Sequence, residues 1–175
     1  MTERDGRCFV DLELAHHSGG GDPLIEPIDA GDAGELLTLQ RAAYVTEARI
    51  YGDPALPALV QSLDELIEEL SRSLAFKVTA GRRMIGAVRA QAEAEVLHVG
   101  RLVVAPDQQG RGLGTALLRS VERSAGPEVR RAALFTGHLS FANIRLYERL
   151  GYVEERREEL KPGVVLVHLT KPLFH

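Results

Sequence analysis

Three glycines within five residues separate an apolar, β-branched segment from a leucine-rich one, and this stretch constrains the fold more than any other. It reads VVAPDQQGRGLGTALL, with glycine at positions 110, 112 and 114. Glycine loses more conformational freedom on folding than any other residue, so a glycine cluster at the start of a helix costs stability. The N–H groups at a helix N-terminus lack intrahelical partners and carry partial positive charge. The pattern therefore predicts a loop whose main chain lies against an anion such as a phosphate.

The spacing of these glycines excludes the two most common nucleotide-binding motifs. The dinucleotide-binding pattern G-x-G-x-x-G requires a third glycine where this chain has Thr115 or Leu117. The Walker pattern requires a lysine after its last glycine, and none follows here. A binder of nucleotide phosphates through some other motif stays among the functions considered.

Hydrophobic periodicity before the loop predicts one strand followed by two helices. PLIEPID is typical of a strand, and Asp32 with Glu35 predicts a capping box that opens a helix to about Ile50. YGDPALPALVQ breaks that helix with glycine and prolines, and Ser62 with Glu65 predicts a second capping box. The apolar face of the second helix is expected at Leu63, Leu66, Ile67, Leu70 and Leu74.

From residue 74 the periodicity becomes that of strands. LAFKVTA and MIGAVRAQ predict a hairpin, and a longer strand is expected from Val96 to Val104. After the glycine loop, a third helix is marked by Leu113, Leu117, Leu118 and Val121. RRAALFT predicts a further strand, SFANIRLYERLG a helix that ends at Gly151, and YVEERREEL with VVLVHLT a closing hairpin. This order of elements is typical of a mixed α/β domain.

Composition narrows the classes of function. The formal net charge is −4 and the isoelectric point is about 5.9, so no global field attracts nucleic acid or an anionic membrane. No apolar run approaches the roughly 20 residues that span a bilayer, and we expect a cytoplasmic protein. Cys8 is the only cysteine and the histidines lack metal-ligand spacing, so neither an internal disulfide nor a metal site is expected. Residues 1–22 are expected to form an extension, either an extra strand or a disordered segment, before a single domain at 23–175.

The loop and a second motif together resemble one family. Gln109 to Gly114 fit the pattern Q/R-x-x-G-x-G/A, and Tyr147 lies 33 residues after Gly114 in NIRLYERLGY. These motifs, and the order of elements from about Leu24 to Thr170, resemble the GNAT superfamily of N-acetyltransferases, which bind acetyl-CoA. The resemblance implies an α/β (mixed α+β) fold: a central, mostly antiparallel sheet of six to seven strands, flanked by about four helices and splayed between the fourth and fifth strands.

The resemblance also implies where acetyl-CoA binds. The strand before the loop splays from its neighbour in this family, and the pantetheine arm is expected to pair with main-chain groups of Leu102, Val103 and Val104. The pyrophosphate is expected to lie against the amides of Gln109, Gly110, Arg111, Gly112, Leu113 and Gly114. The guanidinium of Arg111 would add a charge-assisted contact to it.

One helix is expected to carry both a cofactor contact and a catalytic acid. Ser140, Asn143 and Tyr147 share a helix face by their spacing. Tyr147 matches the family tyrosine that donates a proton to the departing CoA thiolate, and a core tyrosine on an amphipathic helix is the alternative. Asn143 is expected to bind the cofactor, but the family more often has asparagine at the position of Ser140 and alanine at that of Asn143. Which of the two bonds the cofactor therefore stays open.

The predicted proton acceptor is His98, which lies eleven residues before Gln109. Some family members place a glutamate or histidine at that offset. An imidazole titrates near neutral pH, which suits the removal of a proton from an ammonium. Glu47, His138 and a water chain are the alternatives.

Together these features predict an N-acetyltransferase that moves an acetyl group from acetyl-CoA to a primary amine by direct attack in a ternary complex. The acceptor, a small molecule or a peptide, is not identified by the sequence. The alternative is a CoA-binding regulatory module without turnover. A homodimer is expected only from the family.

Overall fold

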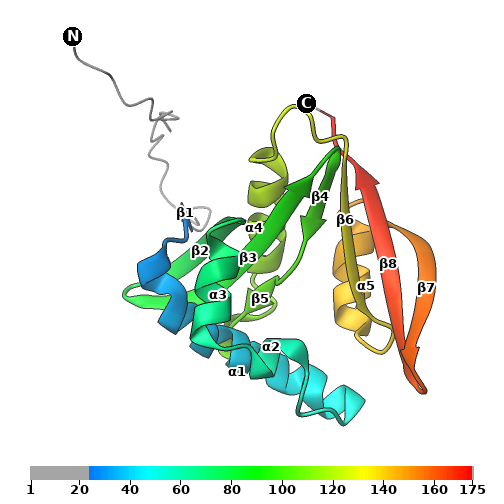
Figure 1. Ribbon diagram of the computed structural model, residues 1–175, viewed down its shortest axis with the longest axis horizontal. Coiled ribbons are helices and arrows are strands. Elements are labelled where there is room, and N and C mark those ends of the chain that lie inside the picture. Colours follow the sequence, from blue (N-terminus) through cyan, green and yellow to red (C-terminus); the bar gives the residue numbers. More distant parts are fainter. Residues whose placement is uncertain (1–23, 175) are drawn as a thin grey trace.

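A mixed sheet of eight strands forms the centre of the domain in the computed structural model, which describes residues 24–174 (Figure 1). The strands are β1 (Ile25–Pro27), β2 (Leu74–Ala80), β3 (Arg83–Glu93), β4 (Val96–Val99), β5 (Val103–Val104), β6 (Arg131–Gly137), β7 (Val153–Lys161) and β8 (Val164–Pro172). The helices are α1 (Ala33–Tyr51), α2 (Pro57–Val60), α3 (Leu63–Leu70), α4 (Leu113–Arg123) and α5 (Phe141–Arg149), with 3-10 turns η1 (Ala30–Asp32) and η2 (Pro106–Gln108). The extension expected at residues 1–22 lies outside the described residues.

The strand order confirms the predicted fold class. It is β1-β2-β3-β4-β6-β8-β7, and β5 also pairs with β3. Every pair is antiparallel except β4 with β6. The described strands and helices outnumber those expected because one strand is split in two and the segment between the first two helices contains the one-turn helix α2.

The sheet splays where it was expected to, between the strands on either side of the glycine loop. β4 pairs with β6 only through residues 96–98 and 131–133. Beyond this point β5 pairs with β3, whereas the rest of β6 pairs with β8. The two halves of the sheet therefore separate after His98, as the diverging green and yellow-to-red strands in Figure 1 show.

The strand predicted from Val96 to Val104 is not continuous, and that prediction was wrong. It breaks after Val99, where the Gly100 N–H donates to the Arg89 carbonyl at 2.8 Å and the Leu102 N–H donates back to the Gly100 carbonyl at 3.2 Å. This tight turn separates β4 from β5. The break falls at Gly100 and Arg101, and a glycine inside a strand pattern is a signal of such an irregularity that the prediction did not use.

Helices cover both faces of β3. A Cβ on Gly86 would lie 3.0 Å from the Leu117 side chain of α4, so Gly86 faces that helix. Arg89, an odd number of residues further along, faces the opposite side and bonds Gln40 of α1. The middle of β3 is consequently buried on both faces, and the core runs along it.

The second predicted capping box is confirmed. The Glu65 N–H donates to the Ser62 hydroxyl at 3.2 Å, and the Ser62 N–H donates to the Glu65 carboxylate at 2.7 Å. Only Leu66 of the predicted apolar face is fully buried, while Leu63 and Ile67 stay about two-fifths exposed. Leu74 belongs to β2, because α3 ends at Leu70.

The first capping box was predicted at the wrong position and lies three residues earlier in the chain. A 3-10 turn precedes α1, and the reciprocal bonds are made by Asp29 with Asp32. Asp32 also accepts the Lys77 ammonium at 2.6 Å, and Glu35 accepts the Met84 N–H at 2.6 Å. The two carboxylates thus attach the start of α1 to the sheet, which a reading of local sequence does not reveal.

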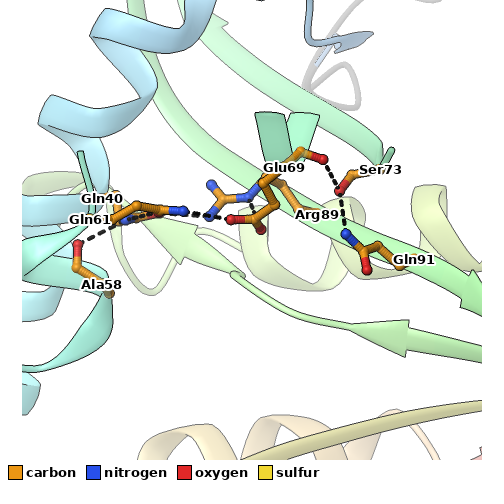
Figure 2. A network of polar contacts seen from close by, with 7 residues as sticks. All are labelled: Gln40, Ala58, Gln61, Glu69, Ser73, Arg89 and Gln91. Atoms are coloured by element: carbon orange, nitrogen blue, oxygen red, sulfur yellow. Dashed lines mark hydrogen bonds and ion pairs between the residues drawn. The ribbon is translucent and has the colours of Figure 1, made fainter. Parts of the chain in front are cut away.

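A buried arginine fixes α1 relative to the sheet (Figure 2). Arg89 is 1% exposed, and its Nε lies 2.9 Å from Glu69 of α3 while Nη2 donates to the Gln40 side chain of α1 at 2.8 Å. Gln40 in turn donates to the Ala58 carbonyl of α2 at 2.8 Å. Burial lowers the pKa of Arg89, and the charge of Glu69 opposes that shift. One guanidinium therefore links three helices to β3.

Candidate active site

The glycines of the loop are required for two different reasons. Gly110 and Gly112 have φ of 77° and 80°, in the left-handed region, and an added Cβ on either would point into open space. Gly114 lies in the first turn of α4, where a Cβ would be 3.4 Å from Leu146 of α5. Two glycines thus shape the loop, and the third lies where an added Cβ would touch the Leu146 side chain.

This backbone leaves a row of N–H groups without partners. Among the described residues, no acceptor is present for the N–H groups of residues 111–115; the first helical bond of α4 runs from Ala116 to the Gly112 carbonyl at 3.0 Å. These donors lie at the positive end of an 11-residue helix. They form an arrangement that suits a phosphate group.

An ion pair holds the beginning of the loop. Asp107 accepts both terminal nitrogens of Arg83, at 2.7 and 2.8 Å. These bonds hold the pKa of the Asp107 carboxyl well below its usual range. Gln109 donates to the Val104 carbonyl at 3.4 Å, while the exposed Arg111 makes no hydrogen bond or ion pair with another described side chain.

β5 has one paired and one unpaired edge. Val103 and Val104 pair with β3, and the Ala105 N–H donates to the Ile85 carbonyl at 2.8 Å. In an antiparallel pair the N–H and C=O groups of successive residues point alternately toward the partner strand and away from it. Since those of Ala105 point toward β3, the main-chain groups of Val104 point away from β3, toward the side where the sheet diverges. Leu102 lies at the start of this edge, against Gly114. This edge of β5 pairs with no other strand, although the Val104 carbonyl accepts from Gln109 and the Leu102 N–H donates to Gly100.

Tyr147 faces α1 from the inner side of α5. It is 7% exposed, and its hydroxyl has no hydrogen-bond partner among the described residues. Burial raises the pKa of Tyr147 well above its usual value, and the nearby Tyr44 and Glu47 of α1 raise it further. Its ring also lies 6.0 Å from that of Tyr152. The phenol therefore stays protonated throughout the pH range in which amines titrate.

Glu47 binds both polar candidates at the start of α5. Its Oε2 accepts the Ser140 hydroxyl at 2.6 Å, and its Oε1 lies 3.5 Å from the Asn143 amide nitrogen. The same nitrogen lies 3.5 Å from the Thr136 hydroxyl. Ser140 and Asn143, expected to bond the cofactor, are thus both in contact with a carboxylate of α1.

His98 lies elsewhere, at the last pair between β4 and β6. Its side chain is 53% exposed and 3.9 Å from Glu93. It lines a cavity of about 570 Å³, together with residues of both halves of the sheet that include Gly100, Ala133, Phe135 and His168. Tyr147 is not among the lining residues. The two predicted catalytic side chains therefore lie in different places: His98 lines the cavity, whereas Tyr147 lies where α5 contacts α1.

The alternative base His138 is engaged by β8. Its Nδ1 lies 3.2 Å from both the N–H and the carbonyl of Val165, and its ring is 6.0 Å from that of Tyr51. These contacts hold the loop before α5 against the last hairpin.

Sequence reasoning missed the aromatic residues of α1. Four polar or aromatic side chains along one face of this helix contact other elements of the domain: Gln40, Tyr44, Glu47 and Tyr51. Their spacing of four, three and four residues is that of one helix face. A search for polar as well as apolar helical periodicity could have found them.

The fold is that of solved N-acetyltransferases, and a family model gives the class of this protein. A family model described as acetyltransferase (GNAT) domain matches residues 53–173. The chain belongs to this family, which confirms the resemblance found in the sequence. Acetyl transfer is the general activity of the family.

Two solved structures illustrate the fold. The ribosomal-protein-S18-alanine N-acetyltransferase of Escherichia coli is 21% identical, with a TM-score of 0.70 over 88% of this chain and 96% of that one. The PaiA N-acetyltransferase of Thermoplasma acidophilum, solved in complex with coenzyme A, is 18% identical, with a TM-score of 0.73 over 87% and 99%. The UPF0157 protein YqkA of Bacillus subtilis is 25% identical over 138 residues, and the match spans 79% of this chain but only 39% of that relative.

None of the helices within residues 24–174 is long and apolar enough to cross a membrane. Within the same residues no three metal-ligating side chains come together.

Proposed function

We propose that this protein transfers an acetyl group from acetyl-CoA to a primary amine, by direct attack of the amine in a ternary complex. The observation that carries the proposal is the row of unpartnered N–H groups at residues 111–115, close in the chain to the edge of β5 that pairs with no other strand. An elongated ligand with a diphosphate at one end and amide groups along its arm would bind the N–H groups of the loop and the edge of β5 at the same time.

The cofactor would then lie along β5 and end at the loop. Its pyrophosphate would accept from the amides of Gln109 to Gly114, and Arg111 is free to add a charged contact. Its pantetheine arm would pair with Leu102, Val103 and Val104 as an added strand. Asn143 is the proposed contact on the α5 side, and its 3.5 Å distance to Glu47 leaves its amide able to turn toward a ligand.

The chemistry requires that the amine lose two protons, one to a base and the other, in net terms, to the CoA sulfur. An acceptor ammonium must first lose one proton to a base. The nitrogen then attacks the acetyl carbon, the C–N bond forms and the C–S bond breaks, and a second N–H proton ends on the CoA sulfur. We assign delivery of that proton to the Tyr147 hydroxyl, whose burial keeps it protonated: the phenol gives its proton to the sulfur and the second N–H proton replaces it, which regenerates the acid.

For the first proton, His98 is the proposed acceptor. Its position on the wall of a cavity of about 570 Å³ gives room for an acceptor molecule next to the imidazole. Glu47, His138 and a water chain remain the competing acceptors. Among them His138 has its Nδ1 committed to Val165.

The decisive experiment separates cofactor binding from turnover. Calorimetric titration with CoA and with ATP should show binding of CoA only. Thiol release from acetyl-CoA, measured against a panel of primary amines with mass detection of the products, should then identify acetylated acceptors. Binding of CoA without release for any amine would support the non-catalytic module instead, and stronger binding of ATP would contradict the proposal.

A further inference from the structure

Arg101, at the break between β4 and β5, is a partly buried cation without a counter-ion. Its guanidinium lies over the Tyr44 ring of α1, 5.8 Å from the ring centre. Within residues 24–174 no carboxylate forms an ion pair with it. A guanidinium that lies over a ring face keeps its N–H donors available to another partner. The ring therefore holds Arg101 in place, while its charge is left without a paired anion.

A second guanidinium takes the carboxylate that lies nearby. Arg89 Nε lies 2.9 Å from Glu69, whose other oxygen accepts from the Gln61 amide at 2.7 Å (Figure 2). Arg89 Nη1 is nevertheless buried without a hydrogen-bond partner. The pKa of Arg89 is lowered first by burial and also by the charge of Arg101, which reaches Glu69 as well. Two guanidiniums thus share one carboxylate, which leaves an excess of positive charge.

The remaining carboxylates close to Arg101 have partners of their own. Arg101 lines a cavity of about 470 Å³, together with Glu65, Glu68 and Glu69 of α3. Glu65 accepts a main-chain N–H at the start of α3 at 2.7 Å, and Glu68 forms an ion pair with Arg72 at 3.4 Å. None of the three glutamates pairs with Arg101.

Arg101 and the proposed base lie on the same face of the sheet. His98 pairs across the strands with Gln91, which follows Arg89 by two residues, so the three side chains share one face. Arg89 faces α1 there through its bond to that helix. Arg101 reaches the same helix through Tyr44. The imidazole and the guanidinium therefore both lie on the side of the sheet that α1 covers.

The cavity beside His98 adjoins the cavity beside Arg101. Glu69 lines both of them, and Gly100 lines the first where its neighbour Arg101 lines the second. His98 and Arg101 are three residues apart, and three residues span at most about 10 Å. One small molecule can thus extend from the imidazole to the guanidinium.

A carboxylate suits this guanidinium, because its two oxygens match the fork of N–H donors and its charge offsets the excess. We infer that Arg101 binds a carboxylate of the acceptor, so that the substrates are amines that also carry a carboxylate, as amino acids do. This inference rests on the proposed function, which places the reacting amine beside His98. It adds a second recognition group, at the other end of the acceptor.

The two contacts together position the reacting nitrogen. A carboxylate held by Arg101 fixes one end of the acceptor, and the amine at the other end then lies next to His98. An amine without a carboxylate lacks this contact and leaves the guanidinium unpaired. Arg101 is therefore expected to select among amines.

The test compares acids with their uncharged amides. 4-Aminobutyrate and 6-aminohexanoate are each titrated by calorimetry against the corresponding amide, which has the same amine and chain but no negative charge. A dipeptide pair, Gly-Glu amide and Gly-Gln amide, makes the same comparison for a peptide acceptor. We expect at least one acid to bind the wild type tenfold more tightly than its neutral counterpart, or about 1.4 kcal/mol. The pair that shows this preference distinguishes a free amino acid from a peptide.

Two variants separate a specific contact from general charge. Arg101→Gln should reduce the preference for the acid below threefold, while the Kd for CoA stays within twofold. Arg72→Gln is the matched control, because it removes another guanidinium of the same cavity, one that is paired with Glu68. This control should keep the full preference.

Each outcome decides the inference. A wild type that binds no acid better than its neutral counterpart would overturn it, and so would an Arg101→Gln variant that keeps the preference. The titrations are made with the CoA complex and with the free chain. A wild type that fails to bind CoA would contradict the proposed function, and the comparison in the free chain would still decide the role of Arg101.

Discussion

The Tyr51 side chain lies directly against the main chain of Gly137, so closely that a Cβ at Gly137 would overlap the Tyr51 hydroxyl. The same hydroxyl accepts the Leu139 N–H at 2.8 Å. The end of α1 is thereby attached to the loop between β6 and α5, on the other side of the splay.

Gly137→Ala should therefore destabilise the protein by about 1–3 kcal/mol, because the new methyl group forces the Tyr51 ring away. Urea unfolding measures this change. Tyr51→Ala in the same chain removes the clash, so the double variant should lose less than the two single effects added together. Strict additivity would show that the two residues do not contact each other in solution.

The ion pair of Glu69 with Arg89 predicts that removing one of the two charges lowers the free energy of unfolding by a large amount. Glu69→Gln leaves the guanidinium, 1% exposed, without its counter-charge, and should cost about 3 kcal/mol at neutral pH. The double variant Glu69→Gln with Arg89→Met removes both charges and should recover part of the loss. Chemical denaturation of the three variants gives the comparison, and an undiminished loss in the double variant would contradict this account.

The same pair predicts a pH dependence. Burial acts to raise the pKa of Glu69, but the charge of Arg89 and bonds from Gln61 and Arg89 outweigh it, so the pKa lies below the usual 4.5. A lowered folded-state pKa contributes stability above the unfolded-state value and loses it as pH falls through the folded-state value. The free energy of unfolding should therefore decline below about pH 4.5 in the wild type, and less steeply in Glu69→Gln. Parallel slopes in the two proteins would contradict the prediction.

The glycine loop predicts a selective loss of cofactor affinity. Gly112→Ala places a side chain at φ of 80°, which costs about 1–2 kcal/mol and distorts the loop whose amides face the proposed phosphate site. The Kd for CoA, measured by calorimetry, should rise about tenfold. Gly126→Ala, at a glycine with a negative φ and open space around its Cα, is the control and should leave this Kd unchanged.

Tyr147 predicts a change in turnover without a change in binding. Tyr147→Phe keeps the buried ring and removes the proton that we assign to the CoA sulfur, so kcat should fall about 10²-fold with any acetylated amine. The Kd for acetyl-CoA should stay nearly the same. Unchanged turnover would leave Tyr147 as a core residue.

His98 is tested by the pH–rate profile of kcat/KM. A base must be unprotonated to act, so the rate with the wild type should fall as the pH is lowered. In His98→Ala this acidic limb should shift or disappear. An acidic limb identical to that of the wild type would exclude His98 and favour the other acceptors.

Local sequence was sufficient for the features that depend on residues a few positions apart. The Ser62–Glu65 capping box, the glycine loop and the helix that carries Tyr147 follow from backbone conformations and hydrogen bonds that neighbouring residues determine. The prediction from local sequence was wrong at Asp32. A 3-10 turn precedes α1, so the capping box forms three residues earlier, and the Asp32 carboxylate binds Lys77, which is 45 residues away.

Sequence alone therefore determined the family of this chain, its strand and helix order except for the break between β4 and β5 and the short helix α2, and the loop that we assign to the cofactor. Only the tertiary structure decided what surrounds these elements. The Ser140–Glu47 bond joins residues 93 positions apart, and it exists because the sheet splays and α1 reaches the second half of the molecule. Periodicity describes one element at a time, whereas the neighbours of Glu47 depend on how distant elements pack, which no local pattern encodes.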